Sequence, residues 1–157
     1  MNNNPLYKLM NPQSIVMAGA GNNPQKMGTL HALNIIEGGY QGKFFPLHPR
    51  DETVLGHRAY QTVAQLPEVP ELAILVVPAE VALQLLDDLG KLGTKRAIVV
   101  TSGFRETGFA GLKKEEQLLE IAHRHGIRFL GPNCIGMVNS HLALNTTVMP
   151  LSNEPGK

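Results

Sequence analysis

The sequence predicts an α/β domain in which a mainly parallel sheet carries helices on both faces. Two observations support this fold class. Short apolar runs that are β-branched or aromatic recur along the chain, and they are apolar at consecutive positions, as strands buried on both faces are. Between them, apolar residues recur at three- and four-residue spacing, which is typical of amphipathic helices. The alternation predicts a doubly wound, Rossmann-like sheet.

The expected elements follow one another with little chain left over. The strands are expected at residues 14–18, 43–47, 72–77, 96–100 and 127–130. A first helix is expected to begin near Gly28 and to end at Gly38-Gly39. Two more are expected to end at Gly93 and Gly126. The apolar positions of these two helices are Val81, Leu85, Leu86, Leu89 and Leu92 in one, and Leu118, Ile121 and Ala122 within residues 112–125 in the other.

Length and composition predict one globular domain. The chain has 157 residues and 43% hydrophobic residues, enough for one buried sheet. We expect the domain to span residues 1–150. Residues 151–157 are expected to begin a linker to a second domain, because the stretch 150–157 is polar and rich in Pro and Asn. The 14 basic and 13 acidic residues form no long run of one sign, so nothing indicates binding to nucleic acid or to a membrane surface.

The single cysteine, Cys134, cannot form an internal disulfide, and the first thirty residues lack the pattern of a secretory signal. No apolar run approaches the roughly 20 residues of a membrane-spanning helix. These features predict a cytoplasmic, soluble protein.

Doubly wound sheets bind ligands at the carboxyl ends of their strands, so the loops there are the candidate site. The first loop, residues 19–28, begins with Gly19-Ala20-Gly21 after a clear strand, a geometry that directs backbone N–H groups and a helix N-terminus at a phosphate. Pro24 stands where a nicotinamide fingerprint has its third glycine. A plain strand-to-helix turn without a ligand is the alternative.

The loop after the second strand distinguishes between cofactors. An NAD site has a carboxylate there for the ribose hydroxyls, whereas this chain has His48-Pro49-Arg50. A cation at this position favours a phosphorylated ribose, which both NADP and coenzyme A carry. A surface ion pair of Arg50 with the following Asp51 or Glu52 is the alternative interpretation.

Six short motifs in the same order resemble a known family over nearly the whole chain. The resemblance is to the N-terminal coenzyme A-binding domain of NDP-forming acyl-CoA synthetases, which include the ADP-forming acetyl-CoA synthetases and, more distantly, the α subunit of succinyl-CoA synthetase. The motifs are Pro12-x-Ser14-Ile15-Val16-x-x-Gly19, Asn22-x-Pro24-x-Lys26-x-Gly28, His48-Pro49, Val76-Val77-Pro78, Ser102-Gly103-Phe104-x-Glu106-Thr107-Gly108 and Gly131-Pro132-Asn133-Cys134-x-Gly136.

The resemblance implies a coenzyme A site along the carboxyl edge of the sheet. The phosphates are expected at the first loop, the phosphorylated ribose at the second, the adenine between apolar side chains, and the pantetheine amides at the fourth and fifth strands. The expected contacts are, in that order, Gly19, Ala20, Gly21, Asn22, Lys26 and Gly28; His48, Pro49 and Arg50; Val77 and Pro78; Thr101, Ser102, Gly103 and Asn133.

No residue of this chain is expected to be catalytic or to bind a metal. Cys134 has no assignable His–Asp pair to activate it, so a buried structural role is favoured over a nucleophile. His123 and His125, two apart on a helix, face different ways, and the other histidines show no metal-site spacing. His31 is expected on the first helix near the phosphate turn, as a packed core residue.

The resemblance implies an activity that needs more than this chain. Such synthetases link an acid to coenzyme A at the expense of ATP or GTP, with Mg expected in the other domains, and pass a phosphoryl group through a histidine of a second domain. An ATP-grasp module, in further domains or in a partner subunit, loads that phosphoryl group. The domain is therefore expected to position coenzyme A for thiol attack on an acyl phosphate and to be inactive alone.

Three alternatives stay open from the sequence. One is a coenzyme A-sensing regulatory domain fused to a protein lysine acetyltransferase, and another is a stand-alone coenzyme A-binding protein. The third is an NADP-dependent oxidoreductase domain, which is disfavoured because no substrate domain or assignable proton donor accompanies the nucleotide fold. The acyl substrate, the choice of ADP or GDP and the oligomeric state cannot be predicted from these residues.

Overall fold

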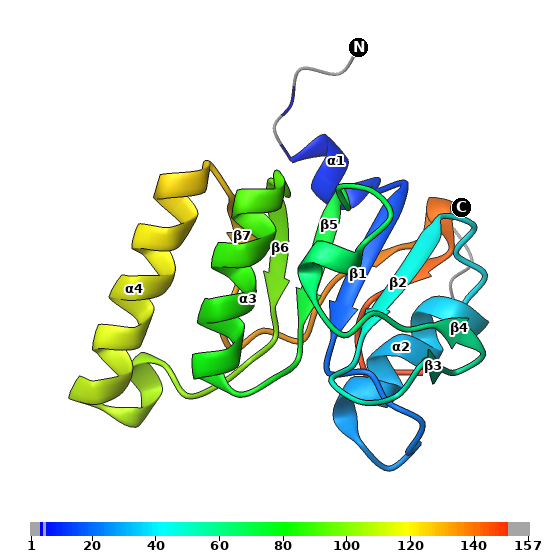
Figure 1. Cartoon of the computed structure of the whole chain (residues 1–157), viewed down its shortest axis with the longest axis horizontal. Helices are drawn as coiled ribbons and strands as arrows, with labels where there is room; N and C mark the ends of the chain where they lie inside the picture. Colours follow the sequence, from blue (N-terminus) through cyan, green and yellow to red (C-terminus); the bar gives the residue numbers. More distant parts are fainter. Residues whose placement is uncertain (1–3, 5, 151–157) are drawn as a thin grey trace.

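A five-stranded, entirely parallel sheet forms the centre of the molecule in a computed structural model, which describes residue 4 and residues 6–150 (Figure 1). Its strand order is β2-β1-β5-β6-β7, so the predicted doubly wound α/β fold is confirmed. The linker was predicted at residues 151–157, which lie outside the described residues. The strands are β1 (Ser14–Ala18), β2 (Lys43–Leu47), β5 (Leu72–Leu75), β6 (Arg96–Val99) and β7 (Arg128–Leu130).

The direction in which the chain adds strands reverses between β1 and β5. From β1 the chain moves outward to β2, then crosses back to β5 and continues through β6 to β7. In register, Ala18 of β1 lies between Leu47 of β2 and Leu75 of β5, so these three strands end at one level. The loops leaving β1 and β5 diverge to opposite faces there, which leaves a crevice at the carboxyl edge.

Alternation along the strands divides the core between the two faces. Val16 and Ala18 pack with the helices α3 (Ala79–Leu92) and α4 (Phe109–His125), which lie side by side on one face (Figure 1). Ile15 and Met17 belong to the second cluster, which is covered by α2 (Met27–Glu37). Both faces of β1 are therefore buried, which explains why the strand is apolar from Ile15 to Ala18.

The predicted helix ends are confirmed at two glycines with left-handed backbone. Gly93 caps α3 with φ of 117° and Gly126 caps α4 with φ of 63°. Helix α4 begins at Phe109, three residues earlier than its apolar pattern predicted. Val81 was predicted to face the sheet, but its side chain is 45% exposed near the start of α3.

The shortest elements were not predicted, because two to four residues give no measurable periodicity. One hairpin follows β2, and a second one covers part of the α2 face. A helix of four residues precedes β1. These elements are α1 (Tyr7–Met10), β3 (Thr53–Val54), β4 (His57–Arg58), β8 (Val138–Asn139) and β9 (Leu144–Asn145), with 3-10 turns η1 (Val63–Gln65), η2 (Arg105–Thr107) and η3 (Ser140–Leu142).

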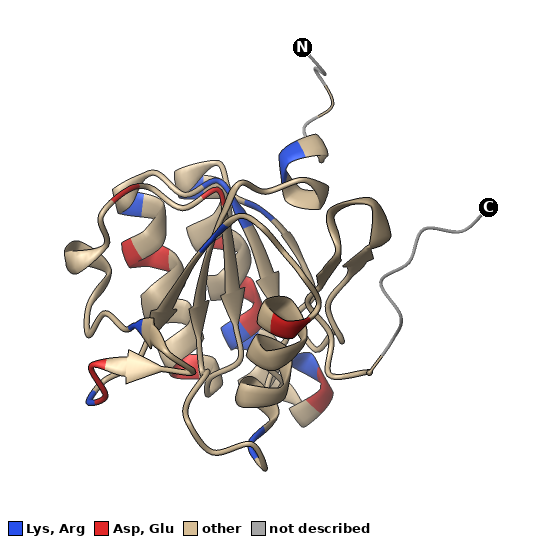
Figure 2. Cartoon of the chain, turned by 90° about the vertical axis from the view of Figure 1, so that its right-hand side faces the viewer, with Lys and Arg blue, Asp and Glu red and all other residues tan. Residues whose placement is uncertain are grey.

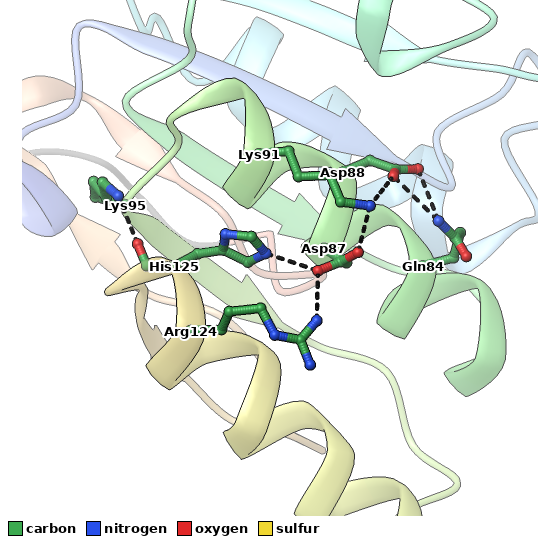
Figure 3. Close-up of polar contacts among 7 residues, drawn as sticks. All are labelled: Gln84, Asp87, Asp88, Lys91, Lys95, Arg124 and His125. Carbon is green, nitrogen blue, oxygen red and sulfur yellow. Dashed lines mark hydrogen bonds and ion pairs between the residues drawn. The ribbon is translucent and has the colours of Figure 1, made fainter.

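A carboxylate joins α3 to α4 at the end remote from the crevice (Figure 3). Asp87 accepts from Lys91 Nζ at 2.6 Å, from His125 Nε2 at 2.7 Å and from Arg124 Nη1 at 3.3 Å. The hydrogen bond from Lys91, followed by that from His125, lowers the pKa of Asp87 to about 2. Gly90 leaves room for the His125 ring, which an added Cβ would meet at 2.4 Å.

Within residue 4 and residues 6–150, the structure contains no helix that is both long enough and apolar enough to cross a membrane.

Candidate functional site

A cleft of about 880 Å³ opens at the carboxyl edge of the sheet, where the strand order reverses. It is bounded by the loops that follow β1, β2 and β5 and by the start of α3. Most of the residues predicted for the first two loops meet here, although they come from segments far apart in the sequence. The lining residues are Ala18, Gly19, Ala20, Gly21, Asn22, Asn23, Lys26, Leu47, His48, Pro49, Arg50, Asp51, Gln61, Val77, Pro78, Val81 and Leu85.

Two glycines of the first loop are required by the packing of the protein itself. Gly19 has φ of +104°, and a Cβ there would lie 2.0 Å from the carbonyl oxygen of Val76. A Cβ on Gly28 would lie 2.1 Å from the carbonyl oxygen of Gly19. Gly28 lies outside the cleft lining, so its role is to let α2 approach the turn closely.

Gly21 differs from these two glycines. A Cβ there would meet only His48 Nε2 and Thr29 Oγ1, both at 3.8 Å, and its φ is not in the left-handed region. The protein fold does not need glycine at this position, so the missing side chain keeps the cleft open for a ligand. Buried Thr29, which the sequence analysis missed, fixes this residue: its hydroxyl accepts the Gly21 N–H and donates to the Gly21 carbonyl, both at 3.2 Å.

Asn22 holds the first loop against the β3–β4 hairpin. Its side-chain amide donates to Asp51 Oδ2 at 3.1 Å and to the Thr53 carbonyl at 2.9 Å. Its carbonyl oxygen accepts the Leu55 N–H at 2.9 Å. The side chain predicted as a ligand contact is therefore occupied by the protein, and Asn22 is a positioning residue for both loops.

The second loop presents a histidine and an arginine to the cleft. The Nδ1 of His48 accepts the backbone N–H of Asp51 at 2.8 Å, so the neutral ring carries its proton on Nε2. Arg50 is exposed and forms no ion pair with Asp51, Glu52 or any other carboxylate in the described part of the chain. The same is true of Lys26, the N-cap residue of α2. Two cations therefore line the cleft, and neither forms an ion pair with a described carboxylate, although Asp51 also lines the cleft.

Apolar side chains form the opposite side of the cleft. Val77 and Pro78 lie there as predicted, and Val81 and Leu85 from α3 extend the same surface. In the sequence, Val81 and Leu85 share the spacing of an amphipathic helix. That spacing does not distinguish a position that faces the cleft from one that faces the core. Val77 and Pro78 also border a smaller hollow of about 340 Å³ that reaches the end of β6. Its other lining residues are Met27, Val76, Val100, Thr101 and Ser102.

The remaining predicted contacts lie around the ends of β6 and β7. Ser102 is exposed, whereas the Thr101 hydroxyl donates to the Leu75 carbonyl at 3.2 Å. The Gly103 N–H donates to the Glu106 carboxylate, and this hydrogen bond is the main cause of the lowered pKa of Glu106. The Asn133 N–H donates to the Thr101 carbonyl at 2.9 Å. Gly103 and Asn133 therefore share this edge but line neither hollow.

The residues that look catalytic in the sequence have structural surroundings. Cys134 Sγ is 3.5 Å from the Val99 carbonyl, and no base among the described residues contacts it. His31 is buried in α2, with Nδ1 donating to the Thr146 carbonyl at 2.6 Å, and burial lowers its pKa. The described residues contain no cluster of His, Cys, Asp or Glu that could hold a metal ion.

A crevice at the reversal point of a doubly wound sheet, with a glycine turn and two free cations, defines a Rossmann-like ligand-binding domain. The sequence profile described as CoA binding domain matches residues 13–140. The chain therefore belongs to the CoA binding domain family.

Relatives and solved structures of the same family resemble the chain over most of its length. It is 41% identical, over 92% of its residues, to the α subunit of acetate–CoA ligase [ADP-forming] II of Pyrococcus furiosus, and 31% identical over 95% to 4-hydroxybutyrate–CoA ligase [ADP-forming] of Nitrosopumilus maritimus. The solved structure of the apo form of dinucleotide-forming acetyl-coenzyme A synthetase 1 of Ca. Korarchaeum cryptofilum superposes with a TM-score of 0.88 at 37% identity and 92% coverage of this chain.

The chain spans only a part of each of these proteins. It covers 31% of the P. furiosus subunit, 22% of the N. maritimus ligase and 31% of the Ca. K. cryptofilum chain. The resemblance to the coenzyme A-binding domain of NDP-forming acyl-CoA synthetases is thus confirmed for the domain.

Proposed function

We propose that this domain binds coenzyme A in the carboxyl-edge cleft and positions its thiol for an ADP-forming acyl-CoA ligase. The observation that carries the proposal is the meeting of Gly21, Lys26, His48 and Arg50 around one cleft, opposite an apolar surface. Backbone amides, a histidine donor and two unpaired cations are suited to the phosphates of a nucleotide. The apolar surface is suited to a purine ring.

The proposal assigns one part of coenzyme A to each part of the cleft. The diphosphate lies over Gly19, Ala20 and Gly21 beside Lys26, with Gly28 and Asn22 shaping the loop beneath it. The 3′-phosphorylated ribose lies against His48, Pro49 and Arg50. The adenine packs on Val77 and Pro78.

The pantetheine arm then follows the smaller hollow along the ends of β6 and β7. That hollow borders the cleft at Val77 and Pro78 and ends at exposed Ser102. Along this path the arm passes Thr101, Gly103 and Asn133. The side-chain amide of Asn133 makes no hydrogen bond within the described residues, so it is free to bond a pantetheine amide.

The reaction of the whole ligase joins a carboxylic acid to coenzyme A as ATP is converted to ADP and phosphate. The thiol sulfur attacks the carbonyl carbon of an acyl phosphate and forms the new C–S bond. Phosphate leaves with the electrons of the C–O bond and takes up the proton that the thiol releases. We assign phosphoryl transfer, with its ATP or GTP and Mg, to parts of the ligase outside this domain. The contribution of the residues described above is to hold the nucleotide end so that the thiol arm is directed outward.

The relatives favour a ligase over the other candidates that the sequence leaves open. The curated relatives named above are ADP-forming ligases, and none carries the name of an acetyltransferase or a dehydrogenase. Titration with NADPH distinguishes an NADP-binding oxidoreductase from a coenzyme A-binding ligase domain. Tight binding of NADPH together with no binding of coenzyme A would favour the oxidoreductase.

Calorimetry with coenzyme A and with dephospho-coenzyme A tests the ligand and its orientation together. Removal of the 3′-phosphate should weaken binding by roughly 1.5–3 kcal/mol, because a charge-assisted hydrogen bond to Arg50 is lost. In Arg50→Gln the two ligands should bind with nearly equal affinity. The matched control is Arg128→Gln, at the start of β7 and therefore at the opposite edge of the sheet.

Two results would contradict the proposal. If the unsubstituted protein binds both ligands equally, the phosphorylated ribose does not lie beside Arg50. If Arg128→Gln erases the difference as fully as Arg50→Gln does, the effect is one of net charge and not of a contact in the cleft.

A further inference from the structure

We infer that the free edge of β7 is a docking site for an extended, acidic segment of a partner polypeptide, which adds to the sheet as a sixth strand. This surface is separate from the cleft, and the inference does not depend on the proposed function. It rests on unpaired backbone groups, on a groove beside them and on Arg128, which forms no ion pair within the described residues.

The backbone of β7 has one side without a partner. The strand is last in the sheet and pairs only with β6, where the Arg128 N–H donates to the Lys95 carbonyl at 2.9 Å. Successive residues of a strand direct their backbone groups to opposite edges. The N–H and C=O of Phe129 therefore point to the open side, and neither forms a hydrogen bond within the described residues.

A groove of about 590 Å³ runs beside these groups. Its lining includes Leu6 and Leu119 of α4, which are 48% and 41% exposed. Ile127 and Phe129 contribute its floor. An added strand sends alternate side chains to the two faces of the sheet, and those that point to the α4 face would meet the apolar residues of this groove.

The edge strand β7 carries a positive charge at Arg128, and the neighbouring β6 carries Arg96, which also interacts electrostatically with Glu71. Arg96 of β6 and Arg128 of β7 are partners in register, which directs their side chains to the same face. Neither arginine forms an ion pair within the part of the chain that the structure describes. In Figure 2 basic residues colour several segments at the amino ends of the strands, where both arginines begin theirs. Like charges side by side on a sheet are unfavourable until an anion lies between them.

The same charge disfavours a second copy of this chain as the occupant. Two β7 edges paired antiparallel about Phe129 would bring one Arg128 from each copy to diagonal positions, about 7–8 Å apart. Charged residues on an edge strand are a common means of preventing such self-pairing. A strand that carries Glu or Asp is attracted where a second copy is repelled. The relatives contain further chain that could supply such a segment, because this chain covers 31% of the P. furiosus subunit and 22% of the N. maritimus ligase.

The test uses the 157-residue chain and two capped probe peptides, Val-Glu-Val-Glu-Val and Val-Lys-Val-Lys-Val. In ¹⁵N NMR titrations the acidic peptide should shift the amides of Phe129 and Gly131, and at saturation it should slow hydrogen exchange of the Phe129 amide severalfold. The basic peptide should do neither. Arg128→Glu should reverse this preference while leaving coenzyme A binding unchanged, which also shows that the variant is folded.

Three results would overturn the inference. The first is that neither peptide moves the Phe129 amide in the wild-type protein. The second is that both peptides shift the Phe129 amide resonance equally in wild type and in Arg128→Glu. Such a result would show that the peptides bind through apolar contacts and that their charge has no influence. The third is concentration-dependent dimerisation, by light scattering, that is lost in Arg128→Glu, because the occupant would then be a second copy.

Discussion

The imidazole of His48 accepts the backbone N–H of Asp51 through Nδ1, at 2.8 Å. This hydrogen bond leaves the ring proton on Nε2, the atom that faces Gly21 across the mouth of the cleft. The backbone of this loop thereby fixes the orientation of the His48 ring, and its Nε2–H is left as a hydrogen-bond donor that points into the cleft. A phosphate oxygen or a ribose hydroxyl of coenzyme A is a matching acceptor.

The tautomer of His48 can be measured directly. Long-range ¹⁵N–¹H spectra should show protonated Nε2 and unprotonated Nδ1 at pH 8. His48→Ala should weaken coenzyme A binding about tenfold, equivalent to about 1.4 kcal/mol, because one donor to the ligand is lost. His123→Ala, at an exposed position of α4, is the matched control and should bind coenzyme A with unchanged affinity. A protonated Nδ1 in the free protein would contradict this account.

Substitution of Gly21 in the first loop should weaken coenzyme A binding without a large change in the free energy of unfolding. Gly21→Ala should change the free energy of unfolding by less than about 0.5 kcal/mol, because its Cβ finds ordinary contacts. It should nevertheless weaken coenzyme A binding, since the methyl group enters the space beside His48 Nε2. Calorimetry and urea denaturation of the same sample give both quantities.

Gly19→Ala is the contrasting variant. Its Cβ would stand 2.0 Å from the Val76 carbonyl oxygen on a left-handed backbone, so a loss of about 2 kcal/mol or more in stability is expected. Equal destabilisation by Gly19→Ala and Gly21→Ala would show that both glycines serve the fold alone.

The sequence was sufficient for the centre of the sheet because the inner strands β1, β5 and β6 are buried on both faces. Residues 14–18 and 43–47 were predicted with the bounds that the structure has, since an apolar run flanked by turns leaves few alternatives. β5 and β6 end at Leu75 and Val99, before the predicted ends, because the following residues turn into the ligand edge.

The position of the candidate site could be predicted from the sequence, but the hydrogen bonds of its residues could not. The carboxyl-edge rule brought Gly21, His48 and Arg50 to one cleft without knowledge of any contact. The rule does not say which polar groups the protein itself uses. Asn22 and Thr101 were predicted as ligand contacts, yet the protein already occupies the Asn22 amide and the Thr101 hydroxyl donor. Those hydrogen bonds join segments far apart in the chain, which no local pattern reveals.

The Asp87 cluster predicts an acid-labile contribution to stability. Hydrogen bonds from Lys91 and His125 lower the pKa of Asp87 to about 2, below the value of about 3.9 for an unfolded aspartate. The contribution is therefore complete above about pH 4 and is lost as the pH falls towards 2. Asp87→Asn should lower the free energy of unfolding at pH 7 by about 0.5–1 kcal/mol and flatten its pH dependence in this window. Asp88→Asn, at an exposed neighbouring position, should leave the window unchanged; a flattened profile in Asp88→Asn would contradict the assignment to Asp87.

Asn22 should act on coenzyme A through the second loop and not by contact. Its amide joins the glycine turn to Asp51 and Thr53, and Asp51 in turn orients His48. Asn22→Ala should therefore weaken binding of coenzyme A more than binding of dephospho-coenzyme A, because the loop that carries His48 and Arg50 at the proposed ribose site loses its anchor to the first loop. Asn23→Ala, the adjacent residue, is the control for a general loosening of the turn. If Asn22→Ala weakens both ligands by the same factor, the amide serves the diphosphate loop alone, and the link to the second loop carries no binding energy.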